Sequence, residues 1–364
     1  MSEADFKPGL EGVIAVETEI AEPDREGGSL RYRGVDIEEL VGAVSYENVW
    51  GLLVDESLEP GMPEPESYEP PFLTGNAPSD VQAEIARLSG VWELGKLHQI
   101  SDEQARDDLA RVSAQVMAIV ARSARVADGQ EDPVPDDVVS RGKTAAEKFL
   151  LRWRGEADAA HVKAIDTYWI STAEHGLNAS TFTARIATST GADAGAAMSA
   201  AIGTLSGPLH GGAPAHVMPM IDEVAGSGDP EGWVKDLLDR GERIMGFGHR
   251  VYRAEDPRAR LLARTAEELG STRVETAKAL EDAALAELQR RHPERVLATN
   301  VEYWAAIVLD VAQIPAKLTP AMFACARVAG WSAHILEQKR VGRLIRPAAR
   351  YVGPRPRSLA SLGS

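Results

Sequence analysis

From Asp36 almost to the end of the chain, apolar residues recur at the spacing of an α-helix, and this pattern constrains the fold more than any other feature. No strand pattern alternates with the helical segments in the way that builds a parallel sheet. β-prone residues are confined to 12–16 and 29–33, where they predict a small hairpin. The chain is therefore predicted to be all-α apart from an N-terminal β-hairpin. Helices are expected over 38–53, 81–97, 102–127, 137–153, 161–186, 194–205, 258–269, 275–291 and 320–337.

The length of the chain and its changes in composition predict more than one domain. A chain of 364 residues exceeds the size at which a single core usually stops growing. Residues 194–205 are mostly small and carry no charge, which predicts a buried helix, either at a subunit interface or at the centre of a large domain. From residue 213 to about 306 the helices are richer in charge and suit a smaller domain. Six prolines within 59–79 predict an irregular loop.

Charge and cysteine content narrow the functional class. The formal net charge of −16 disfavours binding to nucleic acid or to an anionic membrane surface. Cys325 is the only cysteine, so no intramolecular disulfide can form, and its small apolar neighbours indicate a core residue. The N-terminus has no signal-peptide pattern, and no apolar run approaches the roughly 20 residues of a membrane-spanning helix. We therefore expect a cytoplasmic protein.

The segment from Gly246 to Arg258 has the most concentrated chemistry in the chain. Gly246 and Gly248 permit close approach of a ligand to the backbone, and His249 follows them directly. A histidine can protonate a carbonyl oxygen near neutral pH, and arginine matches a carboxylate in two-point contact. The segment predicts a site for a small, multiply anionic substrate with a reacting carbonyl. The alternative is a basic loop whose histidine caps a helix.

Three further segments place polar groups among small or apolar residues, at 174–181, 207–213 and 299–304. Other site classes lack their patterns. The third glycine of a dinucleotide fingerprint, a His-Glu-x-x-His metal motif and a Gly-x-Ser-x-Gly hydrolase motif are all missing from the sequence. No metal site is therefore expected. His98, His161 and His292 are interpreted as surface residues, and His334 as a structural histidine.

Taken in order, these segments resemble the citrate synthase family, and most closely its short, second-type members from actinobacteria. The resemblance covers nearly the whole chain. Its motifs are Tyr32-Arg33-Gly34-Val35-Asp36, Glu174-His175-Gly176-Leu177-Asn178-Ala179-Ser180, Gly207-Pro208-Leu209-His210-Gly211-Gly212, Gly246-Phe247-Gly248-His249-Arg250-Val251-Tyr252-Arg253 and Gly330-Trp331-Ser332-Ala333-His334.

The resemblance implies a homodimer of an all-α fold that condenses acetyl-CoA with oxaloacetate, with no metal and no permanently bound cofactor. The large domain would comprise 1–210 and 307–364, and the small domain 211–306. His210 would stabilise the enol of acetyl-CoA, His249 would protonate the oxaloacetate carbonyl, and Glu302 would be the general base. Oxaloacetate would meet His175, Arg258, Arg327 and Arg346, and CoA would meet Phe247, Gly248, Arg253 and Asn300.

Two positions depart from the family pattern. Glu302 stands where the family has aspartate, and an added methylene moves the carboxylate by about 1 Å, a displacement that can cost roughly 100-fold in rate. Pro214 stands where asparagine is common, and proline removes a backbone N–H. These departures leave three functions open: citrate synthase, 2-methylcitrate synthase acting on propionyl-CoA, or a weakly active paralogue that binds oxaloacetate or CoA. Because the chain also lacks the N-terminal extension of the large NADH-inhibited members, a dimer insensitive to NADH is expected.

Overall fold

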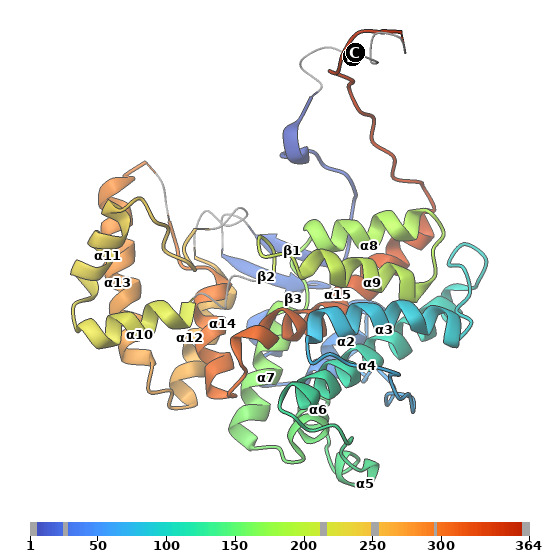
Figure 1. Ribbon diagram of the computed structural model, residues 1–364, viewed down its shortest axis with the longest axis horizontal. Coiled ribbons are helices and arrows are strands. Elements are labelled where there is room, and N and C mark those ends of the chain that lie inside the picture. Colours follow the sequence, from blue (N-terminus) through green and yellow to red (C-terminus); the bar gives the residue numbers. More distant parts are fainter. Residues whose placement is uncertain (1–5, 25–27, 212–216, 249–254, 295–296, 359–364) are drawn as a thin grey trace.

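The computed structural model describes residues 6–24, 28–211, 217–248, 255–294 and 297–358. Within these ranges the chain is mostly helical, as predicted (Figure 1). The fifteen helices in the described ranges are α1 (Ile37–Leu40), α2 (Tyr46–Asp55), α3 (Ala77–Val91), α4 (Asp102–Ala127), α5 (Asp136–Val139), α6 (Ala145–Arg154), α7 (Ala159–Thr172), α8 (Ala179–Ser189), α9 (Ala194–Leu205), α10 (Val217–Ser227), α11 (Pro230–Asp239), α12 (Pro257–Glu268), α13 (Val274–Arg291), α14 (Val301–Val311) and α15 (Thr319–Val341).

A small antiparallel sheet lies near the N-terminus, with the strand order β1 (Ala21–Asp24), β2 (Ser29–Tyr32) and β3 (Val35–Asp36). The expected hairpin is therefore present, but its first strand was placed wrongly. Residues 12–16 are exposed or half-exposed and form no strand, and Ile14 is 89% exposed. A strand requires a partner, and here the partner of β2 is β1, in a register that pairs Ala21 with Tyr32.

Helix α15 forms the centre of the larger group of helices. It packs against α2, α4, α7, α8 and α9 and is buried along most of its length, including Cys325. Helix α9 lies between α3 and α8, and Ala194, Ala197 and Ala201 on it are buried. The small side chains of α9 allow this close approach of neighbouring helices. The predicted buried helix at 194–205 is confirmed, and its place at a subunit interface stays a prediction.

Helices α10 to α14 gather at one side of the molecule (left in Figure 1). Among them α12 packs on α14, and both helices contact α7 of the larger group. The predicted domain boundary at residue 306 falls inside α14, so this helix crosses between the two compositional regions. The division into a large and a small domain stays a prediction. No helix among the described residues is long and apolar enough to cross a membrane.

The single helix predicted over 161–186 is two helices, α7 and α8, with a loop at 173–178 between them. Gly176 adopts φ +65°, a left-handed conformation that favours glycine, and the Asn178 side chain accepts a hydrogen bond from the N–H of Thr181 at 3.1 Å, which caps α8. A similar interruption divides 137–153 into α5 and α6. The apolar periodicity runs through both breaks, and for this reason the sequence pattern alone suggested continuous helices.

Candidate active site

The loop between α7 and α8 carries His175, which is buried. Tyr32 of β2 holds this loop, because its hydroxyl donates to the carbonyl of Glu174 at 3.2 Å and accepts the N–H of Glu174 at 3.3 Å. The carbonyl of Ile170, near the end of α7, lies 3.0 Å from the same hydroxyl and shares its single proton. The N-terminal sheet therefore fixes the position of a histidine more than 140 residues further along the chain.

His210 meets the first turn of α8 through Ser180. The Ser180 hydroxyl lies 2.8 Å from Nε2 of His210, and the backbone N–H of Ser180 donates to the same nitrogen at 3.4 Å. Because an N–H points at Nε2, this nitrogen is the acceptor and the ring proton lies on Nδ1. Burial, together with the charge of Arg327, lowers the pKa of His210 to about 4. His210 is therefore a neutral hydrogen-bond donor at physiological pH.

Arg327 lies on α15 and is buried, with 3% of its surface exposed. Its Nε donates to the carbonyl of Thr172 at 2.7 Å, and its guanidinium stacks over the ring of Phe323 at 4.8 Å. Its Nη1 has no hydrogen-bond partner among the described residues. Burying an incompletely paired cation is unfavourable, so Nη1 is available to bind an anion.

The glycine-rich segment 246–248 is held against 298–300 by three hydrogen bonds. The N–H of Gly248 donates to the carbonyl of Ala298 at 2.8 Å, and the N–H of Asn300 donates to the carbonyl of Gly246 at 2.9 Å. The Asn300 side chain donates to the carbonyl of Gly248 at 3.0 Å. Gly246 has φ +87°, and a Cβ at this position would lie 2.8 Å from the Cβ of Tyr303, so only glycine fits here. Phe247 packs on Tyr303, with ring centroids 5.2 Å apart.

Glu302 lies in the first turn of α14, where Asn300 caps the helix by accepting the N–H of Glu302 at 3.0 Å. Burial raises the pKa of the Glu302 carboxyl to about 7, although Arg258 acts in the opposite direction. A carboxyl group with this pKa can accept a proton near neutral pH. Glu302 therefore has the protonation behaviour of a general base.

Arg258 is paired with Asp256, and both side chains are buried. The Arg258 Nη2 lies 2.8 Å from Oδ2 of Asp256, and its Nε lies 3.0 Å from Oδ1. Asp256 Oδ2 also accepts the N–H of Val301 at 3.1 Å. Asp256 therefore joins the start of α12 to the start of α14 and fixes Arg258 relative to Glu302.

These groups come from separate parts of the sequence and influence one another electrostatically. Arg327 lowers the pKa of His210, and Arg258 lowers that of Glu302 against the larger effect of burial. Arg258 also acts on Arg327, whose pKa is lowered chiefly by burial. The structure thus brings together a neutral histidine, a carboxyl group of raised pKa and two buried arginines. Such a site can abstract a proton beside a carbonyl while it binds a polyanion.

The remaining predicted site residues are either outside the described residues or exposed. His249, Arg253 and Pro214 lie outside the described residues. Arg346 is exposed, just after Ile345, whose N–H donates to the hydroxyl of Ser189 at the end of α8. Ser180, which holds His210, lies near the start of the same helix. His210 and Ile345 thus contact opposite ends of α8, and the role of Arg346 in binding oxaloacetate stays a prediction.

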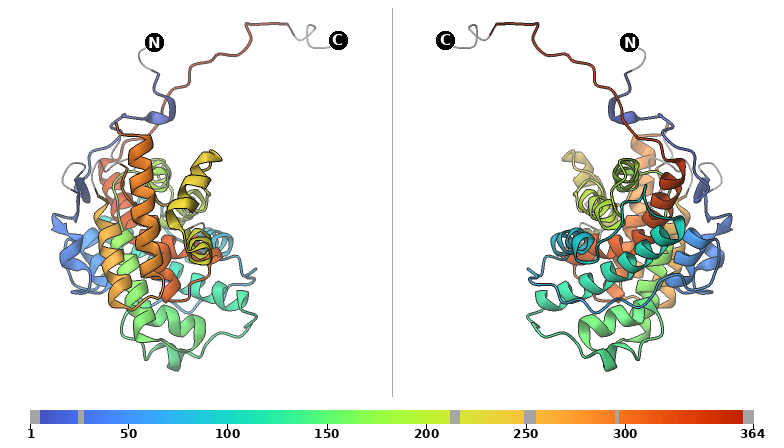
Figure 2. Two further views of the ribbon diagram at one scale, coloured as in Figure 1. Left: turned by 90° about the vertical axis from the view of Figure 1, so that its left-hand side faces the viewer. Right: turned by 90° about the vertical axis from the view of Figure 1, so that its right-hand side faces the viewer.

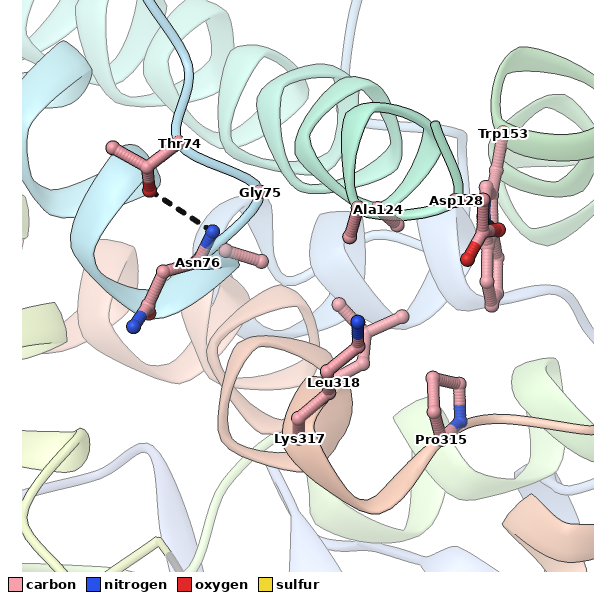
Figure 3. A pocket seen from close by; sticks show the side chains of 11 residues that line it. Thr74, Gly75, Asn76, Ala124, Asp128, Trp153, Pro315, Lys317 and Leu318 are labelled. Carbon is pink, nitrogen blue, oxygen red and sulfur yellow. Dashed lines mark hydrogen bonds between the residues drawn. The ribbon is translucent and has the colours of Figure 1, made fainter. Parts of the chain in front are cut away.

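A distinct cavity of about 270 Å³ lies where the ends of α3, α4 and α6 approach the segment before α15 (Figure 3). It contains none of the predicted site residues. Two pairs of its lining residues are hydrogen-bonded to each other: the indole N–H of Trp153 donates to Asp128 at 2.7 Å, and the N–H of Asn76 donates to the hydroxyl of Thr74 at 3.0 Å. The candidate site is therefore the cluster around His210 and Glu302 and not this cavity.

Sequence reasoning gave no role to Ser180, Asp256 or Tyr32. Asp256 precedes Pro257 at a helix start, a pattern that predicts an N-cap, and its side chain does accept the N–H of Arg258 at 3.0 Å. Nothing in the local sequence predicts that the same carboxylate reaches Val301, because that contact depends on how α12 packs on α14.

The chain is similar to known proteins over most of its length. The family model described as "Citrate synthase, C-terminal domain" matches residues 9–348. "Putative citrate synthase 2" of Mycobacterium tuberculosis strain H37Rv is 56% identical over 360 residues, which cover 98% of this chain and 96% of that protein. The citrate synthase of Haloferax volcanii is 36% identical, over 96% of each chain.

A solved structure is similar over the same length. The ternary complex of citrate synthase from Thermoplasma acidophilum with carboxymethyl coenzyme A and oxaloacetate superposes with a TM-score of 0.84 at 29% identity, and the match covers 98% of this chain and 99% of that one. The family model spans most of the chain, and the fold and the similarity to relatives extend over nearly its full length. The chain belongs to the citrate synthase family.

Proposed function

We propose that this protein is a citrate synthase, which condenses acetyl-CoA with oxaloacetate and water to give citrate and CoA. The observation that carries the proposal is the pairing of a neutral histidine, His210, with a carboxyl group whose pKa is raised to about 7, Glu302, beside buried Arg258 and Arg327. Each group matches one requirement of the reaction. The base must be ionised at working pH, the enolate needs a hydrogen-bond donor, and the second substrate is a dianion.

The first step is removal of a methyl proton from acetyl-CoA by the Glu302 carboxylate. The electron pair of the broken C–H bond moves to the thioester oxygen, and the Nδ1–H of His210 donates a hydrogen bond to this developing enolate. The low pKa of His210 means that the imidazole stays neutral and stabilises the enolate without first having to lose a proton.

The enol carbon then attacks the carbonyl carbon of oxaloacetate, and the carbonyl oxygen takes a proton from His249. Arg258, Arg327 and His175 bind the substrate carboxylates, and Nη1 of Arg327 has no other partner among the described residues. Water hydrolyses the resulting thioester to give citrate and CoA. Phe247, Gly248, Arg253 and Asn300 contact CoA in this proposal.

The active form proposed is a homodimer. Leu209 beside His210 is fully exposed, and Ile186 on α8 is also exposed, so apolar surface lies next to the site. Beyond α15 the chain extends away from the body of the molecule (Figures 1 and 2). Arg346 lies on this extension and would complete an oxaloacetate site from the second copy. Light scattering that gives the mass of a single chain in the presence of both substrates would contradict the dimer.

The test of function is release of free thiol from acetyl-CoA and, separately, from propionyl-CoA, each with oxaloacetate. If the protein is a citrate synthase, it should turn over acetyl-CoA faster than propionyl-CoA. The reverse preference would identify a 2-methylcitrate synthase. The two acyl groups differ by one methylene, a difference that a pocket discriminates by only about 1–3 kcal/mol. Binding of oxaloacetate without thiol release from either thioester would identify a weakly active paralogue and refute the proposal.

A further inference from the structure

A polar stripe runs along one face of the buried helix α15. Arg327, Gly330, His334 and Glu337 are spaced at i, i+3, i+7 and i+10, so they lie on the same side of the helix. His334 has no exposed surface, and Gln338, the next residue on this face, is 2% exposed. A row of polar groups inside an apolar core is unfavourable unless each group has a partner. The partners of this stripe come from the loop that carries His175 and from α8.

Glu174 is the partner at the middle of the stripe. Its side chain is fully buried, and Oε1 lies 3.2 Å from Nε2 of His334. A Cβ on Gly330 would lie 2.1 Å from Oε2 of Glu174, so the glycine leaves the space that this carboxylate occupies. Burial raises the pKa of Glu174, but His334, Arg327 and the backbone N–H of His175 more than reverse that effect, and the pKa lies below its usual value. Glu174 is therefore ionised.

The neighbours of His334 indicate which ring nitrogen accepts a hydrogen bond and which donates one. Nη1 of Arg185 lies 2.7 Å from Nδ1 of His334, and arginine can only donate, so Nδ1 is an acceptor. The ring proton is then on Nε2 and is donated to Glu174. His334 therefore joins the Glu174 carboxylate on one side to the Arg185 guanidinium on the other.

The far end of the stripe connects to both terminal segments. Arg185 forms an ion pair with Glu337 at 2.6 Å, and Oε1 of Glu337 accepts the N–H of Glu19 at 3.0 Å. Gln338 donates to the carbonyl of Arg343 at 3.0 Å, where the C-terminal extension begins. Arg185 and Glu337 balance each other in charge. Nη1 of Arg327 and Oε2 of Glu174 are buried and have no hydrogen-bond partner among the described residues.

We propose that Glu174, held by the Nε2–H of His334, is a positioning residue for oxaloacetate. It fixes the loop that presents His175 and supplies the counter-charge that orients Arg327, without touching the substrate. The proposal rests on the proposed function, because it assigns a role in binding the same substrate. It also explains why a glycine and a histidine occur four residues apart on α15.

A matched pair of His334 variants separates the two hydrogen bonds of the ring. In His334→Gln the side-chain amide nitrogen occupies a position close to Nε2 and can still donate to Glu174. In His334→Asn the shorter amide can accept from Arg185 but cannot reach Glu174. We expect His334→Asn to weaken oxaloacetate binding at least about tenfold, the loss typical of a hydrogen bond to a charged group, and His334→Gln to change it by less than about threefold.

Glu174→Asp provides a second, independent variant, since the shortened side chain can no longer reach His334. Its oxaloacetate affinity should fall as in His334→Asn. Ser332→Ala is the control, because Ser332 is buried on another face of the same helix, with its hydroxyl 3.1 Å from that of Ser113. This control should lower the melting temperature and leave the affinity for oxaloacetate within about twofold of wild type.

The measurements are calorimetric titration of each full-length variant with oxaloacetate, and the KM for oxaloacetate against kcat in the thiol-release assay. The inference is overturned if wild type is active but His334→Asn and Glu174→Asp keep wild-type oxaloacetate affinity while only their melting temperatures fall. It is also overturned if His334→Gln loses as much affinity as His334→Asn. A wild-type protein that binds oxaloacetate but releases no thiol would instead refute the proposed function, and the variant affinities would still test the role of Glu174.

Discussion

Single residues acquire their chemistry here from burial more than from residue type. Glu302 would have an ordinary carboxyl pKa in water, and burial raises it to about 7, whereas burial and Arg327 together lower the pKa of His210 to about 4. These opposite shifts keep the histidine neutral and make the carboxylate basic over the same pH range. The separation of the two pKa values assigns the roles of base and hydrogen-bond donor.

The first prediction concerns the pH dependence of turnover. Because the base must be unprotonated, kcat/KM for acetyl-CoA should fall about tenfold for each pH unit below about 7 and level off above it. His210 stays neutral across this range, so its titration adds no second slope to the pH profile of kcat/KM. Glu302→Gln should lower kcat at least roughly 100-fold and remove the pH dependence. A pH-independent wild-type rate between pH 5 and 8, in an assay limited by chemistry, would exclude Glu302 as the base.

The same carboxyl group should make folding stability depend on pH. Since the pKa of Glu302 is higher in the folded protein than the ordinary value of 4.5, the folded state binds more protons between pH 4.5 and 7. Stability is therefore lost as pH rises through this window. Glu302→Gln should be more stable than wild type at pH 8 by up to about 3 kcal/mol, and the difference should vanish near pH 4. Urea unfolding at both pH values measures it, and equal stability of the two proteins at pH 8 would contradict the raised pKa.

At the scale of elements, the site is built from helix starts and the segments that hold them. Asn178 caps α8 and Asn300 caps α14, so Ser180 and Glu302 both lie in a first turn. Asn300 has a second function, because its side-chain N–H₂ holds the carbonyl of Gly248. One residue thus determines the position of the proposed base and of the glycine-rich segment that is proposed to contact CoA.

Substitutions of Asn300 should separate these two functions. Asn300→Ser keeps a capping oxygen but is too short to reach Gly248, whereas Asn300→Ala loses both contacts. We expect Asn300→Ser to retain nearly wild-type stability while raising the KM for acetyl-CoA several-fold. Asn300→Ala should also lose about 1 kcal/mol of unfolding free energy. Thermal unfolding and steady-state kinetics measure the two effects, and an unchanged KM in Asn300→Ser would mean that the Gly248 contact does not shape the CoA site.

At the scale of the whole molecule, the proposed oxaloacetate ligands are distributed over separate helix groups. Arg258 lies on α12 among the helices gathered at one side of Figure 1, whereas Arg327 lies on the central helix α15. Ion pairs such as Lys163 with Glu268, 2.7 Å apart, link α7 to α12 across the same junction. A substrate that contacts both groups would draw them together and complete the acetyl-CoA site.

Binding of the two substrates should therefore be coupled. Oxaloacetate should tighten the binding of carboxymethyl-CoA, an analogue that cannot react, by about tenfold, and by linkage the analogue should tighten oxaloacetate binding equally. Calorimetric titration of each ligand in the absence and presence of the other checks both directions. Equal affinities for carboxymethyl-CoA with and without oxaloacetate would show that no such closure occurs.

The sequence by itself determined the helical fold, most helix positions and the residue types at the site. Apolar periodicity and capping residues act locally, and for this reason α4 and α9 were predicted to the residue, whereas the break between α7 and α8 was missed because periodicity continues across it. Sequence motifs likewise indicated His210, Glu302 and Arg327 through resemblance to a family.

Only the tertiary structure decided how these residues behave. The pKa of Glu302, the pairing of Arg258 with Asp256 and the contact of Glu174 with His334 all depend on burial and on neighbours distant in sequence. It also left Arg346 exposed, whereas Arg258 and Arg327 are buried. Solvation and contact distance set charge and hydrogen bonding, and both are created by packing between elements, which no local pattern of residues encodes.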